Sequence, residues 1–127
     1  MQILLIEPDT ILANVYKNTL ERVGHKVARV TTAQAGVTVA DMRKPDVVIM
    51  ELQLATHSGV AFLYEFRSYA DWLHVPIIIH SVMHPSQIRR FEQAFTELGV
   101  VQYLYKPTTS LRKLVRAAEQ SQTSVIS

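Results

Sequence analysis

The stretch PDVVIME, residues 45–51, places four consecutive apolar residues directly before a glutamate. Three other short apolar runs also end in a polar group that can do chemistry: residues 3–6 before Glu7, 76–79 before His80 and Ser81, and 100–105 before Lys106. Such runs, without alternation, are typical of strands buried on both faces in a parallel sheet. Because the carboxyl ends of parallel strands share one edge, we expect two carboxylates, a hydroxyl and an ammonium to meet in one crevice.

Segments with helical periodicity separate these runs. The first helix is expected to begin after Asp9, its N-cap, and to end at Gly24, and residues 25–30 alternate like an edge strand. The apolar faces expected on the five helices are Leu12, Val15, Tyr16, Leu20 and Val23; Ala33, Val37 and Ala40, interrupted by Gly36; Phe62, Leu63, Phe66 and Ala70, after Gly59; Ile88, Phe91, Phe95 and Leu98, from about Pro85; and Leu111, Leu114, Val115 and Ala118. Five strands alternating with five helices predict an α/β domain with right-handed crossovers.

Length and composition favour one domain. The chain has 127 residues, of which 48% are hydrophobic, enough for a sizeable core, and we expect the domain at 1–119 with a polar tail at 120–127. The absence of cysteine excludes disulfides and thiolate chemistry. No apolar segment approaches the roughly 18 residues that span a bilayer, and a net charge of +2 is too small to favour nucleic acid. We therefore expect a cytoplasmic protein without membrane or direct nucleic-acid partners.

Five pieces of sequence, in this order and spacing, resemble a known family. They are Glu7-Pro8-Asp9, the stretch from Pro45 to Glu51, Leu52-x-Leu54-x-x-x-Ser58-Gly59, the stretch from Pro76 to Ser81, and Gly99-x-x-x-Tyr103-Leu104-x-Lys106-Pro107. Together they cover nearly the whole chain and resemble the receiver domains of two-component response regulators. The resemblance implies a flavodoxin-like (CheY-like), doubly wound sheet of five parallel strands in the order 2-1-3-4-5, with five helices. It also implies a role in phosphorelay signal transduction.

Two departures from the family pattern fall on its chemistry. In that family an aspartate ending the third strand accepts a phosphoryl group, and an acidic pair after the first strand helps to hold Mg²⁺. Here Glu51 stands at the acceptor position, and Pro8 replaces one acid of the pair, so that only Glu7 remains. The additional methylene advances the carboxylate by up to about 1.5 Å. Because phosphoryl transfer depends on positioning and on charge neutralisation by metal, we expect little or no phosphorylation of Glu51.

The resemblance also implies roles for three further residues. Ser81 and Lys106 match positions that contact the phosphoryl oxygens, and Tyr103 matches a switch aromatic that turns inward when the residue at position 81 is drawn toward the site. We expect Glu51 to accept hydrogen bonds from Lys106 and Ser81 and so to imitate part of the phosphorylated state, with the Tyr103 rotamer set permanently. The alternative is structural: a buried ion cluster of Glu7, Glu51 and Lys106, a Ser81 bonded only to backbone, and a Tyr103 that is ordinary core.

These observations predict an atypical, degenerate receiver (a pseudo-receiver) that is not an enzyme, needs no cofactor and acts through protein–protein interaction. A second hypothesis retains phosphotransfer to Glu51, with Mg²⁺ held by Glu7 together with Asp9 or Glu51, although helix capping is the preferred role of Asp9. In a third hypothesis the chain is the N-terminal regulatory domain of a DNA-binding transcriptional regulator, and the tail at 120–127 is the linker to its effector domain.

Basic residues suggest where a partner would bind. Five cations on the fourth and fifth helices are expected on one face: Arg89, Arg90, Arg112, Lys113 and Arg116. A solvated face is the preferred interpretation. The alternatives are an acidic protein partner or a homodimer through the fourth helix, fifth strand and fifth helix, with a sensor kinase as a further partner implied by the resemblance.

Overall fold

The computed structural model describes residues 1–54 and 58–123, and it contains a five-stranded parallel sheet in the order β2-β1-β3-β4-β5. Its strands are β1 (Gln2–Ile6), β2 (Lys26–Val30), β3 (Val47–Met50), β4 (Ile77–Ser81) and β5 (Val100–Tyr105). The strand order confirms the doubly wound fold expected from the sequence, with β2 and β5 at the two edges.

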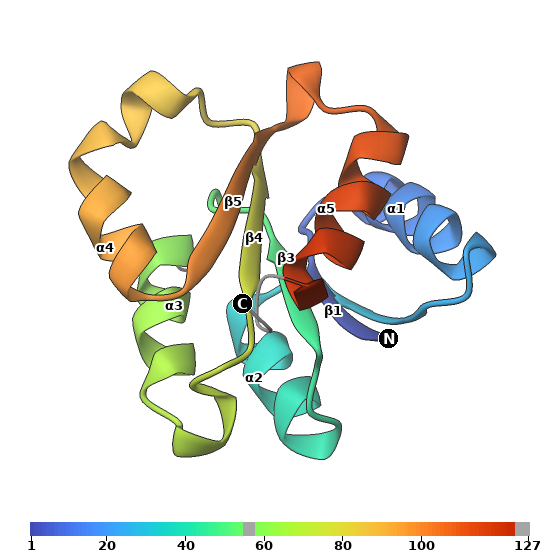
Figure 1. The fold of residues 1–127 in the computed structure, drawn as a ribbon, viewed down its shortest axis with the longest axis horizontal. Helices are drawn as coiled ribbons and strands as arrows, with labels where there is room; N and C mark the ends of the chain where they lie inside the picture. Colours follow the sequence, from blue (N-terminus) through green and yellow to red (C-terminus); the bar gives the residue numbers. More distant parts are fainter. Residues whose placement is uncertain (55–57, 124–127) are drawn as a thin grey trace.

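Helices cover both faces of this sheet. The α-helices are α1 (Thr10–Arg22), α2 (Ala33–Met42), α3 (Gly59–Arg67), α4 (Glu92–Glu97) and α5 (Leu111–Thr123), and the 3₁₀ helices are η1 (Ala70–Trp72), η2 (Pro85–Gln87), η3 (Arg89–Phe91) and η4 (Lys106–Thr108). Helices α1 and α5 lie on one face, and α2, α3 and α4 lie on the other (Figure 1). None of the described helices is long and apolar enough to cross a membrane.

Alternate residues of the central strands build two separate cores. Ile3 and Leu5 of β1 pack on the side of α1 and α5, whereas Leu4 and Ile6 pack on the side of α2, α3 and α4. All four side chains are at most 1% exposed, which explains why these strands read as unbroken apolar runs. Gly36 belongs to this packing, because a Cβ atom there would lie 2.8 Å from the Ile6 side chain. The glycine that interrupts the apolar stripe of α2 therefore allows a close helix–strand approach.

The fourth helix is shorter than predicted. The sequence predicted one helix from about Pro85 to Leu98, but η2 and η3 precede a six-residue α4. Between η2 and η3, Ile88 leaves the helical region (φ −117°, ψ 12°) and its side chain is 4% exposed. The chain bends to bury Ile88 and then starts the helix again.

Two apolar faces also differ from those predicted. In α1 Val15 is exposed, as is the C-cap residue Val23, while Ala13 takes part in the core instead. In the third helical segment, α3 ends at Arg67, and Ala70 is an exposed residue of η1. The buried contacts of these helices therefore cover narrower faces than their apolar residues indicated.

The last helix extends past residue 119, where the sequence analysis placed the end of the domain. Helix α5 runs to Thr123, four residues past the expected domain end at 119, and Ser121 is buried. At the start of this helix Leu111 is 41% exposed, so it does not belong to the predicted buried face. The first half of the predicted tail is therefore helix, and residues 124–127 of that tail lie outside the described residues.

Candidate functional site

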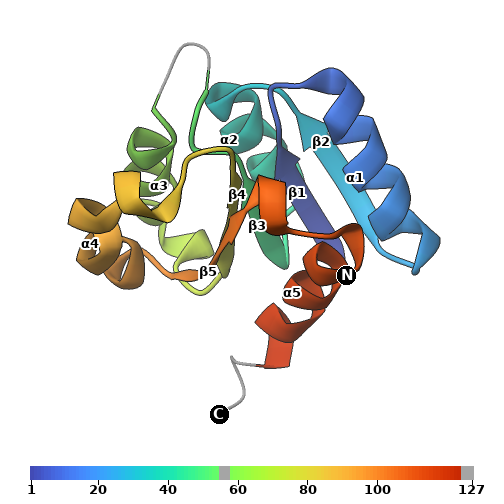
Figure 2. The same cartoon turned by 90° about the horizontal axis from the view of Figure 1, so that it is seen from above.

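The carboxyl edge of the sheet gathers the polar groups that end the strands, and Figure 2 views the molecule from that side. Glu7 follows β1, Glu51 follows β3, Ser81 ends β4, and Lys106 follows β5 as the first residue of η4. Glu7 and Glu51 are each 2% exposed, and Ser81 is fully buried. The expected meeting of two carboxylates, a hydroxyl and an ammonium is confirmed by the contacts among these four residues.

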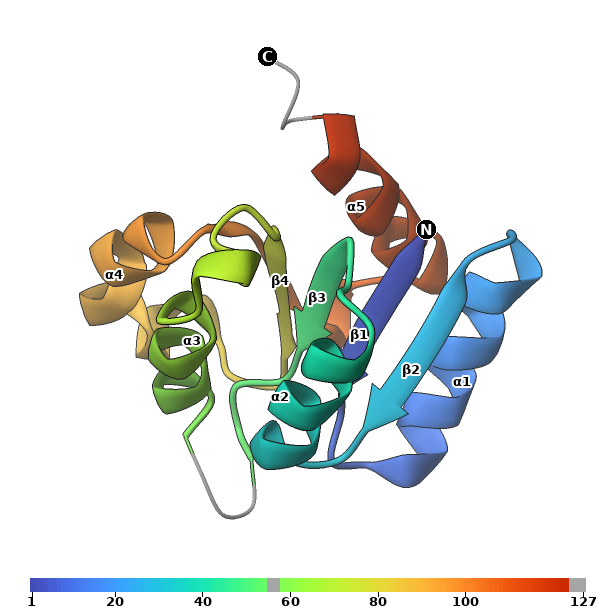
Figure 3. The ribbon, with the colours of Figure 1, turned by 90° about the horizontal axis from the view of Figure 1, so that it is seen from below.

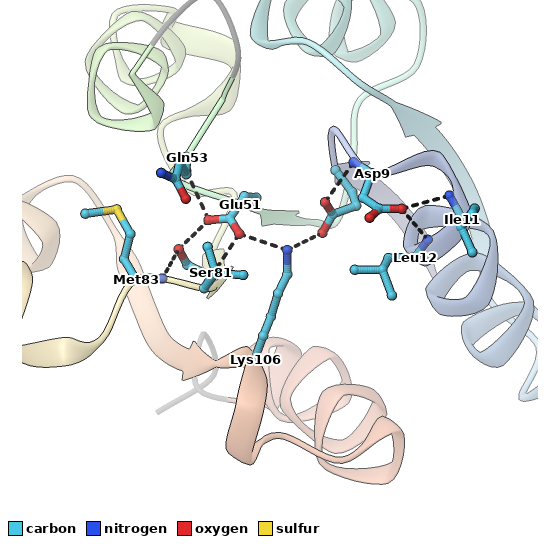
Figure 4. Close-up of polar contacts among 10 residues, drawn as sticks. Asp9, Ile11, Leu12, Glu51, Gln53, Ser81, Met83 and Lys106 are labelled. Carbon is cyan, nitrogen blue, oxygen red and sulfur yellow. Dashed lines mark hydrogen bonds and ion pairs between the residues drawn. The ribbon is translucent and has the colours of Figure 1, made fainter.

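The Glu51 carboxylate is held by four donors (Figure 4). Oε1 accepts from Lys106 Nζ at 2.8 Å and from the backbone N–H of Val82 at 3.0 Å. Oε2 accepts from the backbone N–H of Gln53 at 3.0 Å and from the Ser81 hydroxyl. The bonds from Lys106 and Ser81 were predicted. The two backbone donors could not be, because a backbone N–H group is present whatever the side chain. Each carboxylate oxygen thus has two partners.

Lys106 joins the two acidic side chains. Its Nζ lies 2.6 Å from Glu7 Oε1 and 2.8 Å from Glu51 Oε1, and its side chain is 9% exposed. The second oxygen of Glu7 accepts the backbone N–H of Asp9 at 3.1 Å. One ammonium between two carboxylates leaves a net charge of −1 in this cluster.

Both members of the Lys106–Glu51 pair have shifted pKa values. Burial alone raises the pKa of the Glu51 carboxyl, but hydrogen bonds from Gln53, Lys106, Ser81 and Val82 outweigh burial and hold the pKa below its ordinary value. Burial alone lowers the pKa of the Lys106 ammonium, but hydrogen bonds and charge interactions with Glu51 and Glu7 raise it above its ordinary value. Both residues therefore remain charged across the neutral range.

Asp9 serves the start of α1. Its Oδ1 accepts the backbone N–H groups of Ile11 and Leu12, both at 3.0 Å, which confirms the predicted N-cap (Figure 4). Asp9 is also exposed, and its described contact with the cluster is the backbone N–H that it donates to Glu7. Its side chain thus has a structural role that is independent of the acidic cluster.

The acidic cluster does not fit a Mg²⁺ ion. Mg²⁺ requires oxygen ligands in near-octahedral geometry, whereas both oxygens of Glu7 and both oxygens of Glu51 already accept hydrogen bonds, and the ammonium of Lys106 bridges the two carboxylates. Among the described residues, no group of three or more His, Asp or Glu side chains is placed to hold a metal ion. A metal would have to displace Lys106 first.

A chain of hydrogen bonds connects Glu51 to Tyr103. The Ser81 hydroxyl donates to Glu51 and accepts the backbone N–H of Met83 at 3.1 Å, and the Met83 carbonyl accepts the Tyr103 hydroxyl at 2.6 Å. The Tyr103 ring stacks on Phe95 of α4 with centroids 6.5 Å apart. Burial raises the pKa of Tyr103, so its hydroxyl remains a donor at neutral pH. The position of this ring is thereby tied to the carboxylate site.

His80 is a second buried group near the site that the sequence identified only as the end of an apolar run. It is 3% exposed, and its ring meets Tyr16 of α1 edge-on, with centroids 4.8 Å apart. Burial, assisted by the charge of Lys106, lowers the pKa of His80 to about 4. The imidazole is therefore neutral at physiological pH.

Three of the five basic residues predicted on one face line the same groove. A groove of about 430 Å³ between β5 and α5 is lined by Arg112, Lys113 and Arg116, with Gln102 at its β5 side. A second groove, of about 350 Å³, lies between α4 and β5, and its lining is mainly apolar: Pro85, Ile88, Phe95, Val100, Val101 and Tyr103, with Gln102 and Glu92. Gln102 borders both grooves, so a basic and an apolar surface meet along the β5 edge.

Comparisons with known proteins agree with this architecture. The chain is 30% identical over 105 residues to the KDP operon transcriptional regulatory protein KdpE of Escherichia coli (strain K12), a match that covers 83% of this chain and 44% of that protein. It is 25% identical over 120 residues to the alginate biosynthesis transcriptional regulatory protein AlgB of Pseudomonas aeruginosa, with coverage of 94% of this chain and 25% of that protein. The chain thus spans less than half the length of these two relatives.

Solved structures share the fold at low sequence identity. A sensor protein from Polaromonas sp. JS666 superposes with a TM-score of 0.86 at 20% identity, covering 98% of this chain and 97% of that chain. The chemotaxis response regulator CheY4 of Vibrio cholerae gives a TM-score of 0.83 at 17% identity, covering 94% and 97%. The sequence model of the response regulator receiver domain family matches residues 3–119 of this chain. The chain therefore belongs to the response regulator receiver domain family.

Proposed function

We propose that this receiver domain holds a signalling-competent conformation without phosphorylation and acts through protein–protein interaction. The supporting observation is the Glu51 carboxylate, bound by Lys106 and Ser81 at the end of β3. In this proposal the side chain at the phosphoacceptor position takes the place of the phosphoryl group. The Ser81 hydroxyl, which donates to Glu51, also accepts the backbone N–H of Met83, and the Met83 carbonyl accepts the Tyr103 hydroxyl. In this proposal these bonds keep Tyr103 turned inward.

The glutamate replaces only part of what a phosphoryl group supplies. A phosphoryl group carries nearly two negative charges and three acceptor oxygens, whereas Glu51 carries one charge and two oxygens. Two oxygens are enough for the four donors that surround them, and charge-assisted bonds of this kind are stronger than neutral ones. The proposal therefore requires a conformation stabilised by these bonds, and does not require the full charge of a phosphorylated site.

Phosphorylation of Glu51 is disfavoured for the same reason. Attack on a phosphodonor requires a free oxygen lone pair, in-line geometry and metal, but each oxygen of Glu51 is already engaged and Lys106 lies where charge neutralisation would occur. In addition, Pro8 supplies no carboxylate to a metal. The competing hypothesis, phosphotransfer with Mg²⁺ held by Glu7 and Asp9, requires these contacts to open.

The test is incubation with a small phosphodonor and Mg²⁺, followed by intact mass measurement. We expect no Mg²⁺-dependent phosphoryl adduct on the natural sequence. The control is the double variant Pro8→Asp with Glu51→Asp, which restores the family's acids and is expected to gain an adduct. A stable Mg²⁺-dependent adduct that maps to Glu51 would refute the proposal.

The partner surface proposed for this domain is the β5 edge with the two grooves beside it. Tyr103 lines the apolar groove between α4 and β5, so a partner bound there senses the position of this ring. An acidic protein segment would match Arg112, Lys113 and Arg116 in the neighbouring groove, and a second copy of the chain is the alternative. Measurement of the molar mass in solution by light scattering distinguishes the two: a dimer supports self-association, and a monomer supports a different protein partner.

The named relatives suggest one further candidate role. KdpE and AlgB are transcriptional regulatory proteins, and this chain covers 44% and 25% of their lengths. By analogy, the domain is proposed to regulate an effector domain that follows residue 127 in a longer protein. The sequence of the gene downstream of codon 127 tests this directly, because a DNA-binding domain encoded in the same reading frame would support the role.

A further inference from the structure

A histidine caps the segment that follows β4. The side chain of His84 accepts the backbone N–H of Ser86 at 3.1 Å through Nδ1, and the Ser86 hydroxyl lies 2.9 Å from the same nitrogen. In return, the Gln87 side chain accepts the backbone N–H of His84 at 2.9 Å. Because Pro85 has no N–H, that of Ser86 is the first one in η2 that needs a partner.

The same segment carries the link from the site to the output surface. Met83, directly before His84, donates to Ser81 and accepts from Tyr103. Pro85, directly after His84, lines the apolar groove with Tyr103. His84 thus lies between the backbone that holds the Tyr103 hydroxyl and the groove that Tyr103 helps to form.

The geometry determines which nitrogen of His84 carries the proton. A backbone N–H can only donate, so the Nδ1 atom that accepts it must be unprotonated, and the neutral ring carries its proton on Nε2. A doubly protonated imidazole would present an N–H to the N–H of Ser86 and would lose this bond. Caps are usually Ser, Thr, Asp or Asn, whose side-chain oxygens are acceptors, whereas an imidazole nitrogen stops being an acceptor once it is protonated.

We propose that His84 makes this receiver domain pH-sensitive: protonation of Nδ1 breaks the bond from the Ser86 N–H at the start of η2 and shifts this segment, which releases Tyr103 from the Met83 carbonyl. Acidification then reshapes the apolar groove between α4 and β5 and weakens binding of a partner there. The switch goes beyond the proposed function, since it requires only the described contacts of the segment and not the state of Glu51.

The ring of His84 has one described aromatic neighbour on another element. Tyr105 of β5 meets it edge-on, with centroids 5.1 Å apart. The other described contacts of His84 are with Ser86 and Gln87, whose side chains are neutral. The acid-dependent change is therefore assigned to His84 itself.

The test follows two NMR signals through a titration from about pH 8 to about pH 5. Long-range ¹⁵N spectra of the histidines report the tautomer and titration of His84, and ring-¹³C tyrosine signals report Tyr103. We expect the proton of His84 on Nε2 at high pH, and a Tyr103 signal that moves with the same midpoint as His84.

Three variants make the test decisive. His84→Asn retains an acceptor at every pH and is expected to keep Tyr103 in the high-pH state throughout, whereas His84→Ala is expected to show the low-pH state at every pH. His74→Asn, at an exposed histidine before β4, is the matched control and is expected to retain the natural response.

A His84→Asn variant with the natural pH response would overturn the proposal. So would a His84→Ala variant that keeps the high-pH Tyr103 signal, or a proton on Nδ1 of His84 at high pH. Detection of a phosphoryl adduct on Glu51 would refute the proposed function but would not change any of these outcomes.

Discussion

At the scale of single residues, Lys106 determines whether the site can exist in its observed form. It is the cation between Glu7 and Glu51, which are both almost fully buried. Buried carboxylates are costly unless they are paired, and removal of one partner leaves an uncompensated charge in a medium of low dielectric constant. The cluster therefore behaves as a unit.

Replacement of Lys106 by methionine keeps the volume and removes the charge. We expect Lys106→Met to lower the free energy of unfolding by about 3–5 kcal/mol, measured by urea denaturation at neutral pH. The matched control is Lys113→Met on the exposed face of α5, for which a change within about 0.5 kcal/mol is expected. If the two variants lose equal stability, Lys106 does not compensate the buried carboxylates.

His80 gives the fold a defined sensitivity to acid. Its pKa is lowered from 6.5 to about 4 in the folded protein, so the unfolded chain binds the proton first. The associated stability is complete above pH 6.5 and is lost as the pH falls toward 4, which amounts to about 2 kcal/mol between pH 7 and pH 5. We expect His80→Phe, which keeps a ring against Tyr16, to lose less stability than the natural chain in urea denaturation over this pH range. Equal losses in the two proteins would show that His80 is not the group responsible.

At the scale of elements, sequence patterns predicted the strands better than the helices. Unbroken apolar runs such as residues 47–50 can be recognised as strands from the sequence, because both faces of such a strand are buried. The first helix was equally clear, since Asp9 marks its start. The division of the fourth helix was not predictable, because it depends on Ile88 finding a place in a core that other elements build.

In the site, likewise, the side chains at the strand ends could be predicted from the sequence, whereas the groups that depend on tertiary contacts could not. Parallel strand ends placed Glu7, Glu51, Ser81 and Lys106 together by topology alone. The N–H groups of Gln53 and Val82 were missed because backbone donors depend on loop geometry. Both grooves beside β5 likewise depend on side chains from separate elements.

Arg67 holds the junction between elements on the α3 side of the sheet. Its guanidinium donates to the carbonyls of Leu98, at 2.6 Å, and of Trp72 and Val75. These carbonyls belong to the segments before β4 and β5. One residue at the end of α3 thus fixes two connections.

We expect Arg67→Met to destabilise the fold by at least about 2 kcal/mol in thermal or urea unfolding, because several carbonyls lose their donor together. Arg67→Lys is expected to recover little of this loss, since one ammonium does not reproduce the planar fork of donors. Arg89→Met, at an exposed arginine of η3, is the control and is expected to be nearly neutral. A neutral Arg67→Met variant would mean that the three carbonyls find other donors.

At the scale of the whole molecule, the two ends of the domain are held differently. At the carboxyl edge of the sheet, the bonds from Glu51 through Ser81 and Met83 to Tyr103 connect the buried cluster with the α4–β5 groove. At the opposite end, from which Figure 3 views the molecule, a hydrogen bond of 3.0 Å between the side chains of His25 and Glu119 joins the loop before β2 to α5. A change at Glu51 is therefore expected at Tyr103 and not at the far end of α5.

The central claim is that the Glu51 carboxylate itself holds Tyr103 inward, and the most direct test is the ring-¹³C NMR signal of Tyr103 in Glu51→Ala compared with the natural chain. Circular dichroism establishes that the variant is folded, and Tyr103→Phe assigns the signal. We predict that Tyr103 in Glu51→Ala moves to a solvent-exposed environment, while the natural chain keeps its inward signal with or without a phosphodonor and Mg²⁺. An unchanged Tyr103 signal in folded Glu51→Ala would contradict the claim.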